Sequence, residues 1–412
     1  MSNFFYSIFL FLYVFGVRVL SLFNPKAKLW LKGRKTFPTL NFSAEHIIWV
    51  HCASLGEFEQ GRPVIENIRK QFPESKIVLT FFSPSGYTVQ KNYSGAHAVF
   101  YLPMDSKSNA KKFIDIIKPS LVIWVKYEYW FYYLQELKKQ EIPVLLVSGI
   151  FRENQPFFKW YGGFWKAVLP CFTHLFLQDK SSEILLNSIA VEENITVNGD
   201  TRFDRVIEIA EKFEDLPLIK AFCGNSKIIV AGSTWEDDEA ELIHYVRANP
   251  NIKFIIAPHE IDAENLKDVQ KEFTGSVFYS DLIEGNIINS NVLIIDNVGM
   301  LSRLYHYADI TYIGGGFGDD GVHNVLEAAV YGKPVIYGPE IDKFIEAVEL
   351  TDCGGGIVIN NAIEFEKVAD NLWKNKSVLI AAGAAAKNYV YSKSGASKKI
   401  MDYIYANRLL TN

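Results

Sequence analysis

The sequence predicts an α/β protein with two domains, each built on a parallel β-sheet. Short apolar runs alternate with helical stretches from residue 45 to about residue 199, and a second such series begins at residue 227. Runs of this kind, which are buried on both faces and separated by helices, are typical of parallel sheets. The segment 201–225 between the two series is charged and has no strand pattern, as expected of an interdomain connection. A chain of 412 residues is long enough for two or three domains with well-buried cores.

The composition excludes several classes of protein. Net charge is −5, with no excess of basic residues, which argues against a nucleic-acid partner. The four cysteines are far apart and form no C-x-x-C pair, so neither a zinc knuckle nor a disulfide framework is indicated, and a reducing compartment fits. The sequence also lacks the G-x-S-x-G, G-x-x-x-x-G-K-[ST] and H-E-x-x-H motifs. Serine hydrolases, P-loop ATPases and zinc hydrolases therefore lose their usual support.

The amino-terminal segment predicts a membrane anchor helix within residues 1–24. Residues 4–23 are almost wholly apolar and are interrupted only by Arg18, and about 20 such residues can cross a bilayer. No basic residue precedes the run and no small-residue cleavage site follows it, which argues against a signal peptide. Cations follow directly, which predicts a cytoplasmic location for the rest of the chain. These cations are Lys26, Lys28, Lys32, Arg34 and Lys35. A helix in the membrane plane is the alternative. A third possibility is a helix that only packs on the protein, but the segment has almost no polar face to support it.

The first domain is expected over residues 40–202. Its strand candidates are 47–52, 76–82, 98–101, 121–125, 143–148, 174–177 and 195–197. The turn after the first candidate contains Ser54, Gly56 and Glu57. A carboxylate at the start of a helix favours the helix dipole, and at the mouth of a crevice it can also serve as a general base. Both interpretations of Glu57 stay open at this point.

Two stretches of the first domain are rich in aromatic residues. Residues 124–130 place Lys126 and Glu128 among aromatic side chains, where a charge is costly unless it is paired. The two residues are therefore either partners or site residues. The segment 157–169 is also strongly aromatic, which indicates core packing or, as a sharper alternative, an apolar acceptor surface or membrane-docking patch.

The second domain is expected over residues 226–386, after a linker at 203–225. Its strand candidates are 227–231, 253–256, 292–295, 309–313, 334–337 and 356–359. Ser233 and Thr234 follow the first strand, where small residues can donate hydrogen bonds to a phosphate. His259 follows the second strand, where it either acts as a base or only lines the wall of the site. Asp319 and Asp320 are adjacent acids in a glycine-rich turn without further ligands, so no metal is expected. The tract 387–412 predicts helical structure that packs across the domain junction.

A glycine-rich turn follows the strand candidate 309–313 and is the most informative stretch of this domain. It contains Gly314, Gly315 and Gly316, which let the backbone approach a ligand closely. A helix is predicted from His323 onward, with Asn324 as its N-cap and Glu327 completing a capping box. A helix that starts at the carboxyl end of a parallel strand directs its N–H groups into a crevice that suits a phosphate. An ordinary β-loop-α unit is the alternative.

Several short sequence motifs also resemble those of a known protein family. Two α/β domains with a glycine-rich edge on the second suggest the GT-B fold of nucleotide-sugar glycosyltransferases. Residues 54–57 (S-L-G-E) look like S-V-G-E, 101–105 like Y-L-P-x-D, 199–204 like G-N-x-K-F-D, and 232–234 is G-S-T. Residues 321–327 look like G-G-H-N-x-L-E, followed by G-K-P-V and G-P. In order and spacing, these motifs resemble the bacterial 3-deoxy-D-manno-octulosonic acid (Kdo) transferases of lipopolysaccharide synthesis. The resemblance extends along nearly the whole chain, including the membrane segment.

The chain departs from the family pattern at three places. The family's E-T-E-L-W begins here with Lys126, so only its second glutamate, Glu128, is kept. The P-R-H element keeps its proline and His259 but not its arginine, and the N-F-R-E element at 343–346 also lacks one. Lys126, Arg202 and Lys343 are candidates to replace the lost cations toward an anionic donor.

The resemblance implies a GT-B enzyme with two Rossmann-like domains that face one another across a cleft, plus an N-terminal membrane helix. It implies transfer of Kdo from CMP-Kdo to the glucosamine hydroxyl of a lipid A precursor (lipid IVA), with inversion and without a cofactor or metal. Glu57 is then the general base, and Glu128 arranges the acceptor or the base. The expected donor-binding residues are Ser233, Thr234, His259, Gly314, Gly315, Gly316, His323, Asn324 and Glu327. The expected contacts to the acceptor or the donor anion are Ser54, Gly56, Lys126 and Arg202.

The expected partners are the CMP-Kdo donor, the lipid A precursor and the bilayer of the cell inner membrane, with the catalytic domains in the cytoplasm and no nucleic acid. One alternative is another GT-B enzyme, either a UDP-sugar transferase or a nucleotide-sugar epimerase. The other is a membrane-tethered binding protein that keeps the scaffold without catalysis.

Overall fold

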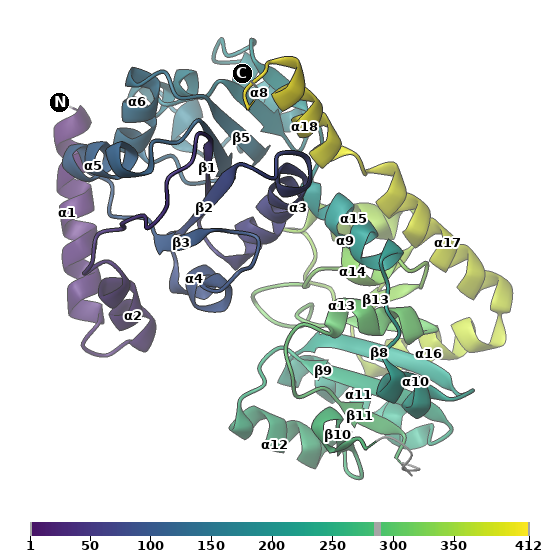
Figure 1. Ribbon diagram of the computed structural model, residues 1–412. Helices are drawn as coiled ribbons and strands as arrows, with labels where there is room; N and C mark the ends of the chain where they lie inside the picture. The colour runs from purple at the N-terminus through teal and green to yellow at the C-terminus, as the bar shows by residue number, and fades with distance from the viewer. Residues whose placement is uncertain (1, 284–289, 411–412) are drawn as a thin grey trace. The chain divides into compact units, whose positions relative to one another are not determined.

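The computed structural model describes residues 2–283 and 290–410 (Figure 1). The chain divides into two compact units, each with its own sheet. Unit 1 comprises Met1–Arg205 together with Ser394–Asn412, and unit 2 comprises Val206–Lys393. The predicted linker at 203–225 is not an extended connection, because it forms most of one helix and the whole of a second, α9 (Thr201–Glu211) and α10 (Pro217–Cys223).

Unit 1 is built on a seven-stranded parallel sheet with the order β3-β2-β1-β4-β5-β6-β7. Each of its strand candidates is confirmed, with ends that shift by at most one residue. The strands are β1 Ile47–Cys52, β2 Lys76–Phe81, β3 Ala98–Tyr101, β4 Leu121–Val125, β5 Val144–Gly149, β6 His174–Leu177 and β7 Ile195–Val197.

Alternation along the strands of unit 1 supplies a core on each face of the sheet. Trp49 and Trp124 point to one face, where they pack in a cluster with α1, α5 and α6. Val50 and Ile123 point to the other face, where α3 and the late helix α18 cover them. Successive side chains of a strand alternate between faces, so fully apolar strands require helices on both sides.

The remaining elements of unit 1 are helical. They are α1 Ser2–Leu20, α2 Pro25–Gly33, α3 Leu55–Gln71, α4 Pro84–Gln90, α5 Lys107–Ile117, α6 Phe131–Lys139, α7 Gly163–Lys166, α8 Lys180–Asn187, α9 and α18 Ala396–Ala406, with 3-10 turns η1 Pro156–Phe158 and η2 Leu169–Cys171. The aromatic segment 157–169 divides: Phe157 and Leu169 are buried in the core, whereas Trp160 is 97% exposed.

Helix α1 lies along unit 1 beside α5 and α6 (Figure 1). Tyr6 and Leu10 are buried against the body, and the Tyr6 hydroxyl donates to Asp105 at 2.7 Å. The outward side of α1 is also apolar and stays exposed, with Phe4, Phe11 and Phe15 each more than half exposed. None of the helices formed by the described residues combines the length and apolar character needed to cross a bilayer. The segment therefore packs on the protein through one face, which the sequence pattern did not favour.

Arg34 does not behave as one of the flanking cations that the sequence suggested. Its guanidinium donates to the carbonyls of Phe82 (2.6 Å) and Leu102 (2.9 Å) and lies over the ring of Trp30. Burial lowers the pKa of Arg34 to about 10. The side chain thus fastens the segment after α2 to unit 1.

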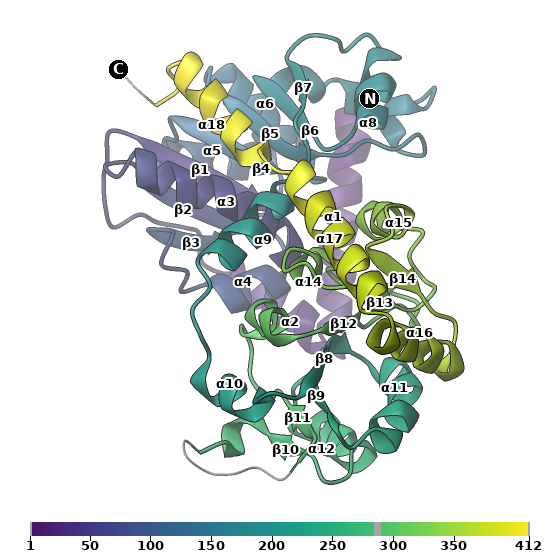
Figure 2. The same cartoon turned by 90° about the vertical axis from the view of Figure 1, so that its right-hand side faces the viewer.

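Unit 2 repeats the plan of unit 1 with the strand order β10-β11-β9-β8-β12-β13-β14 (Figure 2). Its strands are β8 Lys227–Thr234, β9 Ile252–Pro258, β10 Val277–Phe278, β11 Val292–Ile294, β12 Ile310–Ile313, β13 Val335–Tyr337 and β14 Gly356–Val358. The six candidates are confirmed, but β8 and β9 run two or three residues further than expected, and the short edge strand β10 was not predicted. Beside α10, its helices are α11 Glu236–Ala248, α12 Ala263–Glu272, α13 Leu301–Leu304, α14 Leu326–Ala329, α15 Ile345–Asp352, α16 Ala362–Lys374 and α17 Lys376–Ser392, with η3 Tyr279–Asp281 and η4 Tyr305–Tyr307.

The C-terminal tract divides between the two units. Helix α17 belongs to unit 2, whereas α18 lies in unit 1 alongside α3 (Figure 2). Ile400, Met401 and Ile404 of α18 are buried in the same cluster as Phe58 and Ile65 of α3. The last helix is therefore part of the first domain's core.

Each sheet has an internal point at which the strand order reverses beside the first strand of its unit. It lies between β1 and β4 in unit 1 and between β8 and β12 in unit 2. Ligands of open parallel sheets bind outside the carboxyl ends of the strands at such a switch point. The turns after these four strands hold most of the residues that the sequence singled out.

Candidate functional site

Glu57 is held at the start of α3, directly after β1. The backbone N–H of Ser54 donates to Glu57 Oε2 at 3.0 Å, and the Ser54 hydroxyl donates to the same oxygen. Ser54 is the N-cap of α3 and Glu57 its third residue, so the two form a capping box. Both bonds from Ser54 reach Oε2, and the carboxylate is half-buried. The helix-start role and a catalytic role are compatible, because the cap orients the carboxylate.

Gly56 lies beside this carboxylate in the first turn of α3 and is exposed. A Cβ atom at this position would meet only Ser54 Oγ, 3.8 Å away. The fold therefore does not need a glycine there, and the missing side chain leaves the space next to Glu57 open.

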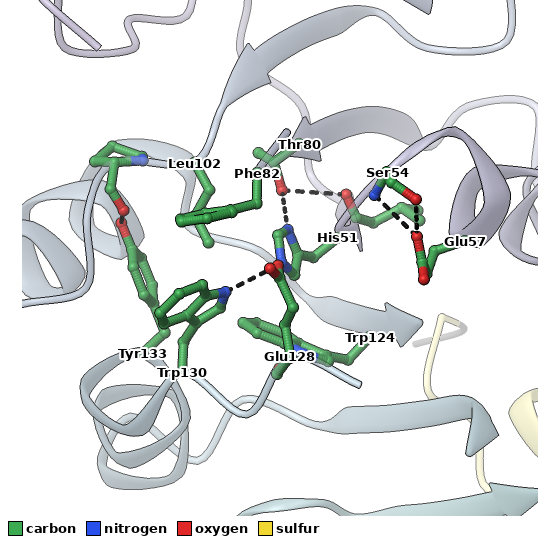
Figure 3. A network of polar contacts seen from close by, with 12 residues as sticks. His51, Ser54, Glu57, Thr80, Phe82, Leu102, Trp124, Glu128, Trp130 and Tyr133 are labelled. Atoms are coloured by element: carbon green, nitrogen blue, oxygen red, sulfur yellow. Dashed lines mark hydrogen bonds and ion pairs between the residues drawn. The ribbon is translucent and has the colours of Figure 1, made fainter. Parts of the chain in front are cut away.

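Glu128, in the turn after β4, is the centre of a buried polar network (Figure 3). Its Oε2 contacts His51 Nε2 and accepts from Trp130 Nε1, both at 3.0 Å. The indole of Trp124 also donates to the Glu128 backbone carbonyl. His51 is fully buried at the end of β1, and its Nδ1 is 2.9 Å from Thr80 Oγ1.

The neighbours of His51 indicate which nitrogen carries its proton. Thr80 Oγ1 already accepts from Trp49 Nε1 at 2.8 Å. Thr80 Oγ1 lies 2.9 Å from His51 Nδ1 and 3.4 Å from the Val50 carbonyl, and the Glu128 carboxylate, which can only accept, requires a proton on Nε2. With Nδ1 accepting, the proton lies on Nε2 and points at Glu128. His51 and Trp130 thus hold one carboxylate oxygen of Glu128 with two N–H donors.

The two predicted cations of unit 1 are already engaged within the protein. The Arg202 guanidinium contacts Asp200 Oδ2 through Nε and Nη2, both at 2.8 Å, and Asp200 also accepts from Gln178. Lys126 has a left-handed backbone with φ 64°, and its ammonium lies 4.8 Å from the centroid of the Tyr127 ring. Their contacts with a substrate stay predictions.

Three aromatic rings form a stack at the carboxyl edge of unit 2. The ring of His259 stacks on both Trp235 and His323, with centroid distances of 4.6 and 4.4 Å, and the rings of Trp235 and His323 lie side by side with centroids 6.4 Å apart. Trp235 Nε1 donates to His323 Nε2 at 2.9 Å, so the imidazole accepts there and carries its proton on Nδ1. Burial, reinforced by His259, lowers the pKa of His323 to about 4. His323 is therefore a neutral hydrogen-bond donor through Nδ1.

The glycine-rich turn after β12 is held by the protein itself. Gly314 N donates to the Gly232 carbonyl at 2.9 Å, and Gly315 N donates to Asp238 Oδ2 at 2.7 Å. Gly315 has φ 89°, and a Cβ atom on Gly316 would lie 2.6 Å from the backbone of Gly338. These glycines thus serve turn geometry and close backbone contact, and two of the amides expected to face a phosphate are paired internally.

The helix after the turn is shorter than expected. Helix α14 begins at Leu326 with Val325 as its N-cap, so the predicted start at His323 and the predicted capping box are wrong. Asn324 instead accepts from Leu326 N at 3.3 Å, and its side-chain amide donates to Glu327 at 2.9 Å. The segment from His323 to Val325 forms an irregular loop, because the backbone N–H of His323 donates to the Gly314 carbonyl.

Ser233 and Thr234 differ in what they offer a ligand. Ser233 is half-buried with a left-handed backbone, φ 55°. Thr234 is buried, and its hydroxyl donates to Glu239 Oε1 at 2.8 Å. Burial raises the pKa of Glu239 to about 7.

Several site residues were not anticipated from the sequence. His51, Thr80, Trp235 and Asp238 support the predicted side chains, but none was a candidate. The signals were a polar residue inside an apolar strand, for His51, and a tryptophan directly after a strand end, for Trp235. Within residues 2–283 and 290–410, no group of three or more His, Cys, Asp or Glu side chains could hold a metal ion.

Comparison with known proteins shows which families this chain resembles. The family model described as "3-Deoxy-D-manno-octulosonic-acid transferase (kdotransferase)" matches residues 28–205. The Kdo transferase of Aquifex aeolicus is 28% identical over 77% of this chain and 83% of its own length. That of Chlamydia trachomatis serovar A is 28% identical over 82% of this chain and 81% of its own. This chain is therefore similar to the Kdo transferases along most of its length.

A longer relative extends the family beyond this chain. A bifunctional glycosyltransferase/methyltransferase of Fusobacterium nucleatum is 26% identical over 87% of this chain, which spans only 58% of that relative's length. Among solved structures, UDP-GlcNAc 2-epimerase from Neisseria meningitidis bound to UDP-GlcNAc aligns with 88% of this chain at a TM-score of 0.62 and 17% identity. That likeness concerns the fold, two parallel-sheet α/β domains of the GT-B type. The chain thus shares its fold with this epimerase.

Proposed function

We propose that this protein transfers Kdo from CMP-Kdo to the glucosamine hydroxyl of a lipid A precursor such as lipid IVA, with inversion. The observation that supports this most is the position of the family motifs. The S-L-G-E and G-V-H-N-V-L-E segments follow β1 and β12, and the G-S-T segment forms the end of β8; all three strands are switch-point strands of their sheets. Ligands bind at such edges.

The reaction is a direct displacement. The acceptor hydroxyl oxygen forms a bond to the anomeric carbon of Kdo, while the bond from that carbon to the phosphate oxygen of CMP breaks. CMP leaves with the bonding electrons, and the hydroxyl proton moves to a carboxylate. Glu57 is the proposed base, since Ser54 fixes its Oε2 and the adjacent Gly56 leaves room for the acceptor. Glu128, held by His51 and Trp130, positions the acceptor.

Replacing the base tests this assignment. The Glu57→Gln variant keeps the size of the side chain and can still form a capping box, so the fold should be retained. We expect a loss of about 10²- to 10⁴-fold in kcat with CMP-Kdo and a lipid acceptor. The matched control is Glu59→Gln, two residues along the same helix, for which we expect near-normal turnover. Near-normal turnover of Glu57→Gln would remove the base assignment.

The donor is proposed to bind at the edge of unit 2. Ser233, Thr234, His323, Asn324 and Glu327 are the proposed contacts, with the glycine turn and His259 completing the set. The neutral His323 donates through Nδ1 to an anionic oxygen, and Trp235 fixes its tautomer. Preorganised donors of this kind stabilise a leaving phosphate.

Nucleotide protection distinguishes this proposal from its rivals. We expect CMP to raise the unfolding temperature of the protein and UDP to have a smaller effect, because a ligand that binds only the native state stabilises it. Trp235→Phe, which keeps the ring but removes the indole donor, should weaken protection by CMP. Protection by UDP but not CMP would favour a UDP-sugar enzyme. CMP binding without turnover on any lipid acceptor would favour a binding protein.

We further infer that α1 attaches the protein to the inner membrane in the plane of the bilayer, with the catalytic units in the cytoplasm. One face of α1 packs on unit 1 through Tyr6 and Leu10, while the opposite face is apolar and exposed. A helix that is apolar all round needs an apolar environment on its outer side as well.

A further inference from the structure

A pocket of about 320 Å³ lies in unit 1 between α1, the turn after β4 and the segment around η1. Its lining includes Tyr6 and Phe9 of α1, together with Trp130, Phe157 and Trp165. Glu128 also lies in its wall and is the only charged side chain among the described residues that line it. The pocket thus begins where the polar network of Glu128 ends.

The chemistry of this lining excludes most ligands. Aromatic walls without a cation do not suit a nucleotide or a phosphate, and the carboxylate of Glu128 repels anions. A pocket of a few hundred cubic ångströms with mainly aromatic walls suits an apolar group of corresponding size.

The exposed face of α1 continues into the pocket. Phe9 lines the pocket, and Phe5 and Leu12 lie four residues before and three residues after it, on the same side of the helix. All three side chains are more than half exposed. An apolar track therefore runs along α1 to the pocket, and a chain that leaves a bilayer along this helix stays in contact with apolar side chains.

We propose that this pocket binds one acyl chain of the lipid acceptor, with Glu128 at the boundary between the chain and the sugar. This inference rests on the proposed function, because it assigns part of the acceptor of that reaction. An acyl chain in the pocket places the attached sugar beside Glu128, the residue that His51 and Trp130 hold in one orientation. The pocket thereby selects acylated acceptors and fixes the position of the sugar relative to Glu128.

The test compares two acceptors that share the same glucosamine disaccharide, one acylated and one fully deacylated. Phe9→Asp places a charge in the lining at an exposed position, and its matched control is Phe15→Asp, on the same helix and similarly exposed. We expect Phe9→Asp to lower kcat/KM for the acylated acceptor about 10- to 100-fold, the size of losing one buried apolar side chain's contact. Its kcat/KM for the deacylated acceptor should stay within about threefold of the wild type. Phe15→Asp should retain activity with both acceptors in detergent.

A binding experiment separates failure of this inference from failure of the proposed function. A brominated dodecyl maltoside, used below its micelle concentration, quenches tryptophan fluorescence on contact. We expect it to quench the wild type and the Phe15→Asp variant, and to quench less in Phe9→Asp and in Trp165→Phe.

Equal losses in the Phe9 and Phe15 variants, or equal quenching in all four proteins, would overturn the pocket assignment. Absence of Kdo transfer to either acceptor by the wild type, together with the expected quenching pattern, would overturn the proposed function and the acceptor role of the pocket, while leaving a site for an apolar chain.

Discussion

The fold does not require a glycine at position 56. The backbone of α3 could carry a side chain there, because a Cβ atom would have only Ser54 Oγ within 4 Å. Glycine in a helix is less stable than alanine by about 0.5–1 kcal/mol. An exposed glycine that gives up stability in the first turn of α3, next to the proposed base, points to a ligand that needs the space.

The Gly56→Ala variant tests whether this glycine lowers stability in order to leave space for a ligand. We expect the free energy of unfolding to stay the same or to rise by up to about 1 kcal/mol, because alanine favours the helix and has room. We expect kcat/KM with a lipid acceptor to fall, since the methyl group enters the space beside Glu57. Urea unfolding and steady-state kinetics measure the two effects. A variant that gains stability and keeps full activity would show that the space is not used.

The side chains of the site were only partly predictable at this scale. Glu57 and Glu128 were candidates from the sequence, because each is a carboxylate within five residues of the end of an apolar run. Their supporting residues could not be found in that way. His51 meets Thr80 because β1 and β2 pair in a register that places these two residues side by side, and Glu128 lies 77 residues from His51. A register of parallel strands depends on the packing of both faces, which no single run of sequence reveals.

At the scale of elements, α18 has a role that its position in the chain conceals. Asp204, at the end of the G-D-T-R-F-D motif, accepts from Gly395 N at 2.5 Å and from Ser397 N at 2.6 Å. It thereby satisfies N–H groups at the start of α18, as an N-cap side chain does. The motif thus fastens the last helix to the first domain, and α18 then closes the hydrophobic cluster beneath α3.

The Ile400→Ala variant measures how much α18 contributes to unit 1. Ile400 is fully buried, so we expect a loss of about 2–5 kcal/mol in the stability of unit 1. Faster hydrogen exchange should appear in α3 and α18, and peptides from unit 2 should keep their rates. Lys399→Ala, an exposed neighbour on the same helix, is the control and should change neither. Equal effects on peptides of both units would contradict the assignment of α18 to unit 1.

Elements with strong patterns were predicted well, and short irregular ones were not. The thirteen strand candidates are mainly apolar runs, and each is a strand in the structure. Helix α14 was predicted too long because the loop from His323 to Val325 has helical composition, yet its backbone bonds to the glycine turn. Strand β10 has only two residues and no pattern of its own, since it forms by pairing with β11.

At the scale of the whole molecule, two units that each contain a seven-stranded parallel sheet differ in the helices that cover them. Only unit 1 contains α1. The sequence predicted this helix but not its packing on the protein. An apolar stripe that contacts protein cannot be told in sequence from one that contacts lipid. Tyr6, Leu10 and Tyr13 recur at spacings of four and three residues on the packed face.

Binding to vesicles tests the proposed attachment of the whole protein. We expect the wild type to float with vesicles made of inner-membrane lipids, and a Phe11→Lys/Phe15→Lys variant to remain largely in solution. Each change removes a large exposed apolar side chain from the proposed interface, and burying such a side chain contributes about 1.5–3 kcal/mol. Ile184→Lys, a similarly exposed apolar residue on α8, is the control and should still float. Flotation of the α1 variant at the wild-type level would contradict the proposed attachment.

The return of the chain to unit 1 at residue 394 has a consequence for biosynthesis. The ribosome makes unit 1 up to Arg205 and then all of unit 2 before it reaches α18. At ordinary elongation rates of about 5–20 residues per second, the 189 residues from 205 to 394 (394 − 205) take roughly 10–40 s to synthesise. Throughout that interval the nascent first domain exposes the apolar face of α3. We therefore expect the later-made unit to complete its fold first and the amino-terminal one to depend on chaperones until translation ends.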